Sequence, residues 1–93
     1  MEDLLYISSL YDYYSCLLTE KERIYFEDYY FNNLTMDEIA QNYNVTKNAI
    51  SKTLIDVKDK IQEYESKLHL ESNRLKIKEL LDEDEYKKIE NYI

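Results

Sequence analysis

The 93-residue chain contains no glycine, no proline and one cysteine, and its 20 acidic residues outnumber its 12 basic ones. This composition favours one domain of helices joined by short connections, because β-rich chains need glycine and proline for turns, and it excludes an internal disulfide framework or a cysteine-based metal site. The net charge of −8 opposes non-specific binding to nucleic acid or anionic lipid. We expect a cytoplasmic protein without membrane insertion, because the sequence has no signal sequence and no apolar run near the roughly 20 residues of a membrane span.

Two helices are predicted in the first 33 residues. One face of the first helix consists of apolar residues at alternating steps of three and four: Leu4, Ile7, Tyr11, Tyr14 and Leu18. Thr19 and Glu22 have the spacing of a capping box, in which each side chain accepts a hydrogen bond from the backbone N–H of the other residue. A second helix therefore begins here, and Asn32 and Asn33 suit its exit because asparagine tolerates a left-handed backbone.

Residues 34–51 have the pattern of a helix-turn-helix. Thr35 and Glu38 form a second capping box, which begins a short third helix. Asn44 then supplies the left-handed turn residue for which glycine is commoner, and Thr46 caps a fourth helix.

The fourth helix is long. Its apolar stripe continues without a break to about residue 70 through Ile50, Leu54, Val57, Ile61, Tyr64 and Leu68. The first half of this stripe can cover a small bundle, whereas the second half extends past it and needs another partner. Residues 72–81 also read as helical, and Asp82 with Glu85 forms a capping box for a last short helix.

The predicted fold is therefore all-α. Residues 1–70 form a bundle of three or four helices that contains the helix-turn-helix and the long fourth helix. Residues 71–93 form a C-terminal helical extension that packs on the same domain or on a partner.

One face of the fourth helix has polar residues suited to a DNA groove. Projected at 100° per residue, the residues available for reading are Thr46, Lys47, Asn48, Ser51 and Lys52. Asparagine can read adenine, and hydroxyls and lysines can hold phosphates. Asp56 and Asp59 lie one turn further on, where the phosphate backbone would pass, and they oppose such binding. The alternative is a helical corner without a nucleic-acid role.

The fourth helix also suggests a protein contact. Ile55 projects outward beside the polar face, where it could mark a partner surface. The candidate residues for a partner or dimer interface are Ile55, Ile61, Tyr64 and Leu68.

No catalytic, cofactor or metal site is expected. His69 has no cysteine or second histidine near it, so a surface position is favoured. Cys16 lies beside the apolar stripe of the first helix and is expected in the core. A single histidine and the absence of a glycine-rich phosphate loop leave no arrangement for catalysis, so we do not expect an enzyme.

Residues 11–68 resemble the YlxM family. The resemblance is most specific in three segments: YDYY…LLTEKE, YFEDYYFNNLTMDEIA and NYNVTKNAI. These small bacterial proteins are similar to region 4 of sigma-70-type sigma factors, and their genes typically lie beside those of the signal recognition particle. The resemblance implies the helical fold, suggests nucleic-acid binding and implies a regulatory role in the signal recognition particle pathway. Family members often carry arginine after the Ser or Thr cap and a basic pair further along. Here Lys47 stands first, and Leu-Ile-Asp-Val follows Thr53.

Three functional hypotheses follow. The first is a regulatory protein of the signal recognition particle pathway that contacts the particle's protein or RNA. The second is a sequence-specific DNA-binding transcriptional regulator that uses residues 46–52. The third is a helical interaction or homodimerisation module that uses the stripe of residues 57–68, and it is compatible with either of the others.

Overall fold

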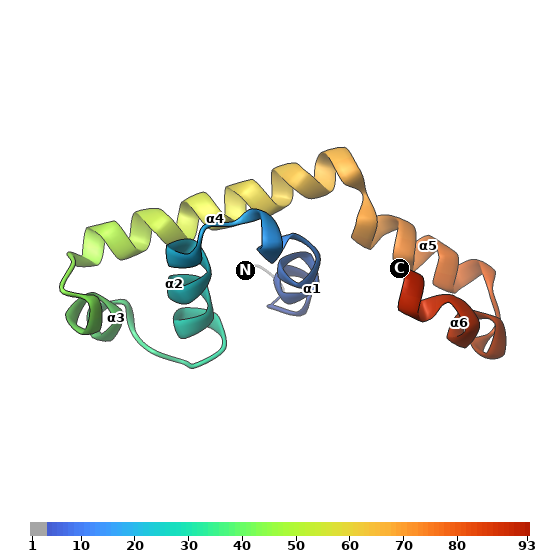
Figure 1. Cartoon of the computed structure of the whole chain (residues 1–93), viewed down its shortest axis with the longest axis horizontal. Helices are drawn as coiled ribbons and strands as arrows, with labels where there is room; N and C mark the ends of the chain where they lie inside the picture. Colours follow the sequence, from blue (N-terminus) through green and yellow to red (C-terminus); the bar gives the residue numbers. More distant parts are fainter. Residues whose placement is uncertain (1–3) are drawn as a thin grey trace.

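The computed structural model describes residues 4–93, and this part of the chain is helical with short connections, as predicted. The helices, in chain order, are α1 (Leu4–Tyr14), the 3-10 turn η1 (Ser15–Leu17), α2 (Glu20–Tyr30), α3 (Met36–Tyr43), α4 (Lys47–Leu68), α5 (Leu70–Leu80), α6 (Glu83–Ile89) and the 3-10 turn η2 (Glu90–Tyr92). Figure 1 shows α4 running along one side of the molecule, with α1, α2 and α3 beneath it. At the far end of α4 the chain turns into α5 and α6, which lie away from α2 and α3, while the start of α5 also contacts α1.

The predicted helix caps are confirmed. Three capping boxes form, and they pair Thr19 with Glu22, Thr35 with Glu38, and Asp82 with Glu85. The Thr46 hydroxyl accepts from the backbone N–H of Ala49 at the start of α4. Asn33 and Asn44 adopt the left-handed conformation at the two exits, with φ of 58° and 55°. Each cap stabilises its helix by about 1 kcal/mol, so the helix boundaries are encoded locally.

The core lies between α1, α2, α3 and α4. Its buried apolar side chains are Ile7, Leu10, Tyr11, Tyr14, Leu18, Tyr25, Phe26, Ile39, Ala40, Ile50, Leu54, Val57 and Ile61. Phe26 is at its centre and stacks on Tyr11, with ring centroids 4.5 Å apart and planes 10° apart. Tyr11 and Tyr14 of α1 thus serve packing, and their hydroxyls reach polar partners at the edge of the core, as Tyr11 does by donating to Glu27 at 2.6 Å.

Two details of the first helix differ from the prediction. α1 ends at Tyr14, and a 3-10 turn follows in which the Leu18 N–H donates to the Ser15 carbonyl at 3.0 Å. This tighter turn still buries Leu18, but it leaves Cys16 exposed instead of in the core. The cause is the Thr19 cap, because α2 begins immediately after it and the chain must reverse within four residues.

The long fourth helix ends where His69 adopts a left-handed conformation, with φ of 55° and ψ of 29°. α5 begins at the next residue, and His69 is exposed, as predicted. The second half of α4 does not require a separate partner, because α1 covers it and buries Ile61 completely.

A buried polar cluster holds the junction of α4 and α5. The Tyr14 hydroxyl donates to Glu65 Oε1 at 2.6 Å, and the same carboxylate accepts from the backbone N–H groups of Glu71 at 3.1 Å and Ser72 at 2.9 Å. The Leu70 N–H donates to the Tyr14 hydroxyl oxygen at 3.3 Å. Burial, followed by the bond to Glu65, raises the pKa of Tyr14 to about 12, so this hydroxyl remains a donor at physiological pH. Glu65 thus supplies the N-terminal cap that His69 does not give α5.

The pKa of the Glu65 carboxyl predicts how stability depends on pH. Burial alone would raise this pKa, but the bonds from Tyr14, Glu71 and Ser72 outweigh burial and hold it below the ordinary 4.5. Because this pKa is lower in the folded chain, the unfolded chain binds the proton at a higher pH than the folded chain does. The ionised Glu65 carboxylate therefore stabilises the fold above pH 4.5, and this stabilisation is lost as pH falls through the folded-state pKa.

We therefore expect the difference in free energy of unfolding between the wild type and Glu65→Gln to shrink as pH falls below about 4.5. Urea unfolding at several pH values measures this difference. Glu63→Gln, an exposed position on the same helix, is the matched control and should give a small difference at every pH. A Glu65→Gln difference that is constant with pH would contradict the assignment.

The molecule is longer than a compact domain of its size. Its radius of gyration is 15.8 Å and its extents are 49 × 25 × 24 Å, whereas a compact chain of this length has a radius of gyration near 12 Å. We call α5, α6 and η2 together (residues 70–93) the arm, since they account for the added length. No helix in the described part of the chain has the length and apolar character needed to cross a membrane.

Candidate nucleic-acid interface

The helix-turn-helix consists of α3, a tight turn and the first turns of α4. Ile39 and Ile50 are fully buried, and Ala40 is small enough to let the two helices approach closely. The left-handed Asn44 lets the Val45 N–H donate back to the Ala40 carbonyl at 3.0 Å, which closes the C-terminal end of α3. The geometry of the motif therefore follows from residues that face inward and does not depend on a ligand.

The structure brings the five predicted groove-reading residues to one end of α4. Thr46, Lys47, Asn48 and Lys52 are exposed, and Ser51 is half-buried. Within residues 4–93, the side chains of Asn48 and Lys52 make no hydrogen bond or ion pair. Their binding to nucleic acid stays a prediction.

The charge around this face is balanced. Lys47 Nζ lies 3.7 Å from Asp37 Oδ2 of α3, and both side chains are exposed. Asp56 and Asp59 are exposed further along α4. Lys58 lies over the Tyr30 ring at 5.5 Å from its centroid, on the flank of the helix. Lys52 is thus the cation on this face that has no acidic partner in the described residues.

A groove of about 790 Å³ lies beside the motif. Its walls come from α1, α2, the loop before α3, the first turn of α3, and α4. They include Leu4, Ile7, Tyr29, Tyr30, Leu34, Met36, Asp37, Lys47 and Lys58. The groove is not evident from the sequence, because it forms only when five separate segments meet. The signal that was available was the pair of apolar residues Leu34 and Met36, which flank the Thr35 cap.

The four residues predicted for a partner interface differ in how exposed they are. Ile55 and Leu68 are 57% and 50% exposed, and Tyr64 is half-buried against Tyr14. Ile61 has no exposed surface, so its assignment to a partner interface was wrong. Its stripe position reflects packing on α1, which the periodicity of α4 alone could not distinguish from packing on another molecule.

The part of the chain described by the structure contains no cluster of three or more His, Cys, Asp or Glu side chains placed to hold a metal ion.

Comparison with known proteins identifies relatives along the whole chain. A family model for UPF0122, described as "Putative helix-turn-helix protein, YlxM / p13 like", matches residues 1–92. A UPF0122 protein of Malacoplasma penetrans is 44% identical over 66 residues, which cover 71% of this chain and 62% of the relative. A UPF0122 protein of Bacillus mycoides is 36% identical over 93 residues, covering 92% of this chain and 84% of the relative. One of a Geobacillus strain is 35% identical over 83 residues, covering 89% and 76%.

Proposed function

The chain belongs to the UPF0122 family of YlxM/p13-like helix-turn-helix proteins, which confirms the resemblance predicted from its sequence, and from this premise we propose that it is a regulatory protein of the signal recognition particle pathway. It acts by contact with the protein or the RNA of the particle. The observation that carries this proposal is the lack of excess positive charge on the helix-turn-helix face, where Asp37 pairs with Lys47 and Asp56 and Asp59 follow.

Electrostatics favour a contact other than duplex DNA. Affinity for a duplex grows with the number of phosphates that cations neutralise, and each phosphate contact releases counterions. The face at the start of α4 offers Lys47 and Lys52 for this purpose, and the ion pair with Asp37 competes for the first of them. A chain of net charge −8 is instead complementary to a basic protein surface.

The apolar features of the same region suit a protein contact. Ile55 is 57% exposed beside the polar face. The groove lined by Leu34 and Met36 opens next to Lys47 and offers a mainly apolar surface. An exposed apolar residue and an adjacent apolar groove are typical of protein-binding surfaces.

DNA-binding regulation is the second candidate function. The observation that favours it is the geometry of the motif, which leaves Asn48 and Lys52 exposed on the first turns of α4. Asparagine and lysine in these positions can contact base edges and phosphates in a major groove.

Three titrations at the same low salt concentration separate these functions. They use the signal recognition particle protein, that protein with its RNA, and mixed-sequence duplex DNA. We expect binding to the particle components at concentrations well below those needed for the duplex. Tight duplex binding that falls steeply with salt, with a slope that shrinks in Lys47→Ala and Lys52→Ala, would instead establish the DNA-binding function.

A charge variant tests the electrostatic argument directly. Asp56→Lys with Asp59→Lys adds cations where the phosphate backbone would pass, and we expect duplex affinity at low salt to rise by about tenfold or more. Asp84→Lys with Glu90→Lys makes the same change of net charge on the arm and serves as the matched control, with a smaller expected rise. Equal effects of the two pairs would show that only net charge matters and that the face of α4 is not special.

A further inference from the structure

A single residue, His69, separates α4 from α5. α4 ends at Leu68 and α5 begins at Leu70. The bend between the two helices comes from the left-handed conformation of His69, in which the Cβ atom of an ordinary residue crowds the following carbonyl oxygen. The sequence contains no glycine or proline, so no helix-breaking residue lies near the bend. The local sequence is therefore compatible with one continuous helix through this point.

The hydrogen bonds on either side of His69 have helical spacing. The His69 N–H donates to the Glu65 carbonyl at 2.8 Å, and the Asn73 N–H donates to the His69 carbonyl at 2.9 Å. Both bonds join residues four positions apart, as in an α-helix. The bend therefore interrupts the helical pattern at the three amides between them, those of residues 70–72.

Two side chains take the place of the missing backbone acceptors. The Leu70 N–H donates to the Tyr14 hydroxyl oxygen at 3.3 Å. The Glu71 and Ser72 N–H groups donate to the Glu65 carboxylate at 3.1 and 2.9 Å. In a continuous helix the same three amides would donate to the backbone carbonyls of residues 66–68. Tyr14 and Glu65 thus compete with the backbone of α4 for the same three donors.

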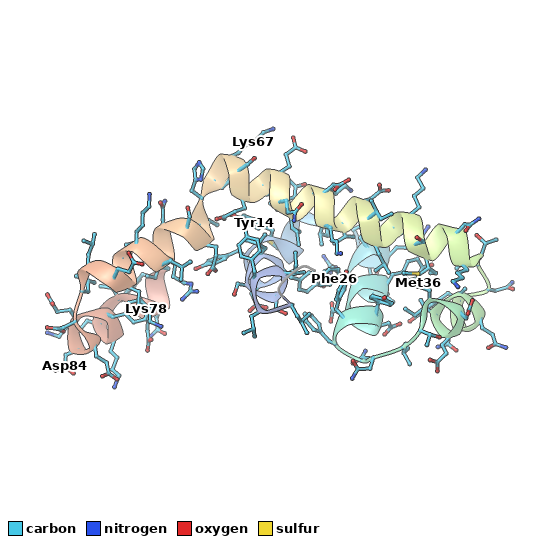
Figure 2. The ribbon with its side chains drawn as sticks, turned by 180° about the vertical axis from the view of Figure 1, so that it is seen from behind. Tyr14, Phe26, Met36, Lys67, Lys78 and Asp84 are labelled. Atoms are coloured by element: carbon cyan, nitrogen blue, oxygen red, sulfur yellow. The ribbon has the colours of Figure 1, made fainter. Side chains whose placement is uncertain are left out.

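The bundle offers the arm little apolar support in the bent position. Within the arm, the one side chain classed as buried is that of Glu71, and no apolar side chain reaches that class. A cavity of about 370 Å³ beside α5 is lined by arm residues and by one residue of the bundle, Tyr13. Figure 2 shows Asp84 at the end of the arm farthest from the core residues Tyr14 and Phe26, so the arm projects away from the bundle. The position of the arm therefore depends mainly on the hydrogen bonds at the bend.

We propose that Tyr14 and Glu65 form a latch that holds the arm bent, and that opening of this latch joins α4 and α5 into one helix over residues 47–80. On opening, the three amides pair with backbone carbonyls, and His69 takes the right-handed conformation. The arm then moves away from α1 and loses its contact with Tyr13. Both positions satisfy the same donors, so a partner that binds one position more tightly shifts the population towards it. The latch does not involve the helix-turn-helix and so does not depend on what that motif binds.

Nuclear Overhauser effects across the bend distinguish the two positions. In a continuous helix the Hα atom of Leu68 lies close to the N–H of Glu71, about one turn further on, whereas the left-handed His69 separates these atoms in the bent position. We expect this contact to appear in Glu65→Ala, because alanine removes the latch and favours a helix, while the chemical shifts of α5 remain helical. The wild type should lack the contact. Glu63→Ala, at an exposed position on the same helix, is the matched control and should lack it too.

A glycine at the bend should reverse the effect of opening the latch. Glycine adopts the left-handed conformation without the crowding of a Cβ atom. Glu65→Ala with His69→Gly should therefore shift the population back to the bent position by about tenfold relative to Glu65→Ala alone. The contact between Leu68 and Glu71 should weaken accordingly.

The proposal is overturned if Glu65→Ala keeps the bend, or if its α5 loses helical chemical shifts. Tyr14→Phe keeps the aromatic ring in the core and removes the hydroxyl from Glu65 and Leu70, so it gives the same readout should Glu65→Ala not fold. Hydrogen exchange alone does not distinguish a straight helix from a melted one. The straight helix exposes the amides of Glu71 and Ser72 to water, so their exchange quickens in either case.

Discussion

Replacing Glu65 with alanine is expected to lower the free energy of unfolding by about 3 kcal/mol, a large part of the stability of a domain this size. The carboxylate accepts from the Tyr14 hydroxyl and from the backbone N–H groups of Glu71 and Ser72. The residue is 8% exposed, so water cannot replace these bonds without opening the junction of α4 and α5. Each buried donor left without an acceptor costs about 1–3 kcal/mol.

Urea unfolding followed by circular dichroism measures this loss. Glu63→Ala is the matched control on the same helix, where the carboxylate is exposed and pairs with Lys67 at 3.0 Å, and it should change stability by less than about 0.5 kcal/mol. Hydrogen exchange should quicken at the Glu71 and Ser72 amides in Glu65→Ala. An effect on stability no larger than that of Glu63→Ala would show that the cluster does not hold the arm.

The local parts of the fold could be predicted because the caps are encoded within a few residues. Thr19, Thr35 and Asp82 each begin a helix by bonding to a residue three positions later, so the sequence contains both partners. The left-handed Asn44 was predictable for the same reason. These signals placed the helix-turn-helix correctly before any tertiary contact was known.

The Glu65 cluster was not predicted, because it joins residues far apart in the chain. Tyr14 and Glu65 are separated by 51 positions, and only Tyr14 belongs to a stripe that periodicity assigns to the core. One signal was present, since Glu65 follows Ile61 by four residues and so places a carboxylate on the apolar side of α4. A charge in that position requires a buried partner, and Tyr14 provides it.

The candidate nucleic-acid interface could be predicted only in part. The outward positions of Asn48, Lys52 and Ile55 follow from the helical projection, and the structure places all three at the surface. The ion pair between Lys47 and Asp37 was not evident, because it depends on how closely α3 approaches the start of α4. That pair changes the electrostatic account of the face, since it reduces the charge available to a phosphate.

Replacing Phe26 with alanine is expected to have the largest effect on stability, a loss of about 4 kcal/mol. Phe26 has no exposed surface, stacks on Tyr11 at 4.5 Å and meets Phe31 edge-to-face at 5.8 Å. Truncation leaves a cavity at the point where α1 and α2 pack together under α4, and aromatic partners cannot collapse into it without leaving their own positions. Thermal unfolding measures the loss, with Phe26→Leu expected to cost less than half as much and the 85% exposed Tyr92→Ala expected to cost little.

The loss of stability in Phe26→Ala should also loosen the attachment of the arm. Tyr14, which holds Glu65, lies on the same helix as Tyr11, so loosening α1 in Phe26→Ala removes the support of the junction between α4 and α5. Hydrogen exchange should therefore quicken at the Glu71 and Ser72 amides in Phe26→Ala, although Phe26 does not touch α5. Unchanged exchange there, in a variant that has lost the expected stability, would mean that the arm is held by α4 alone.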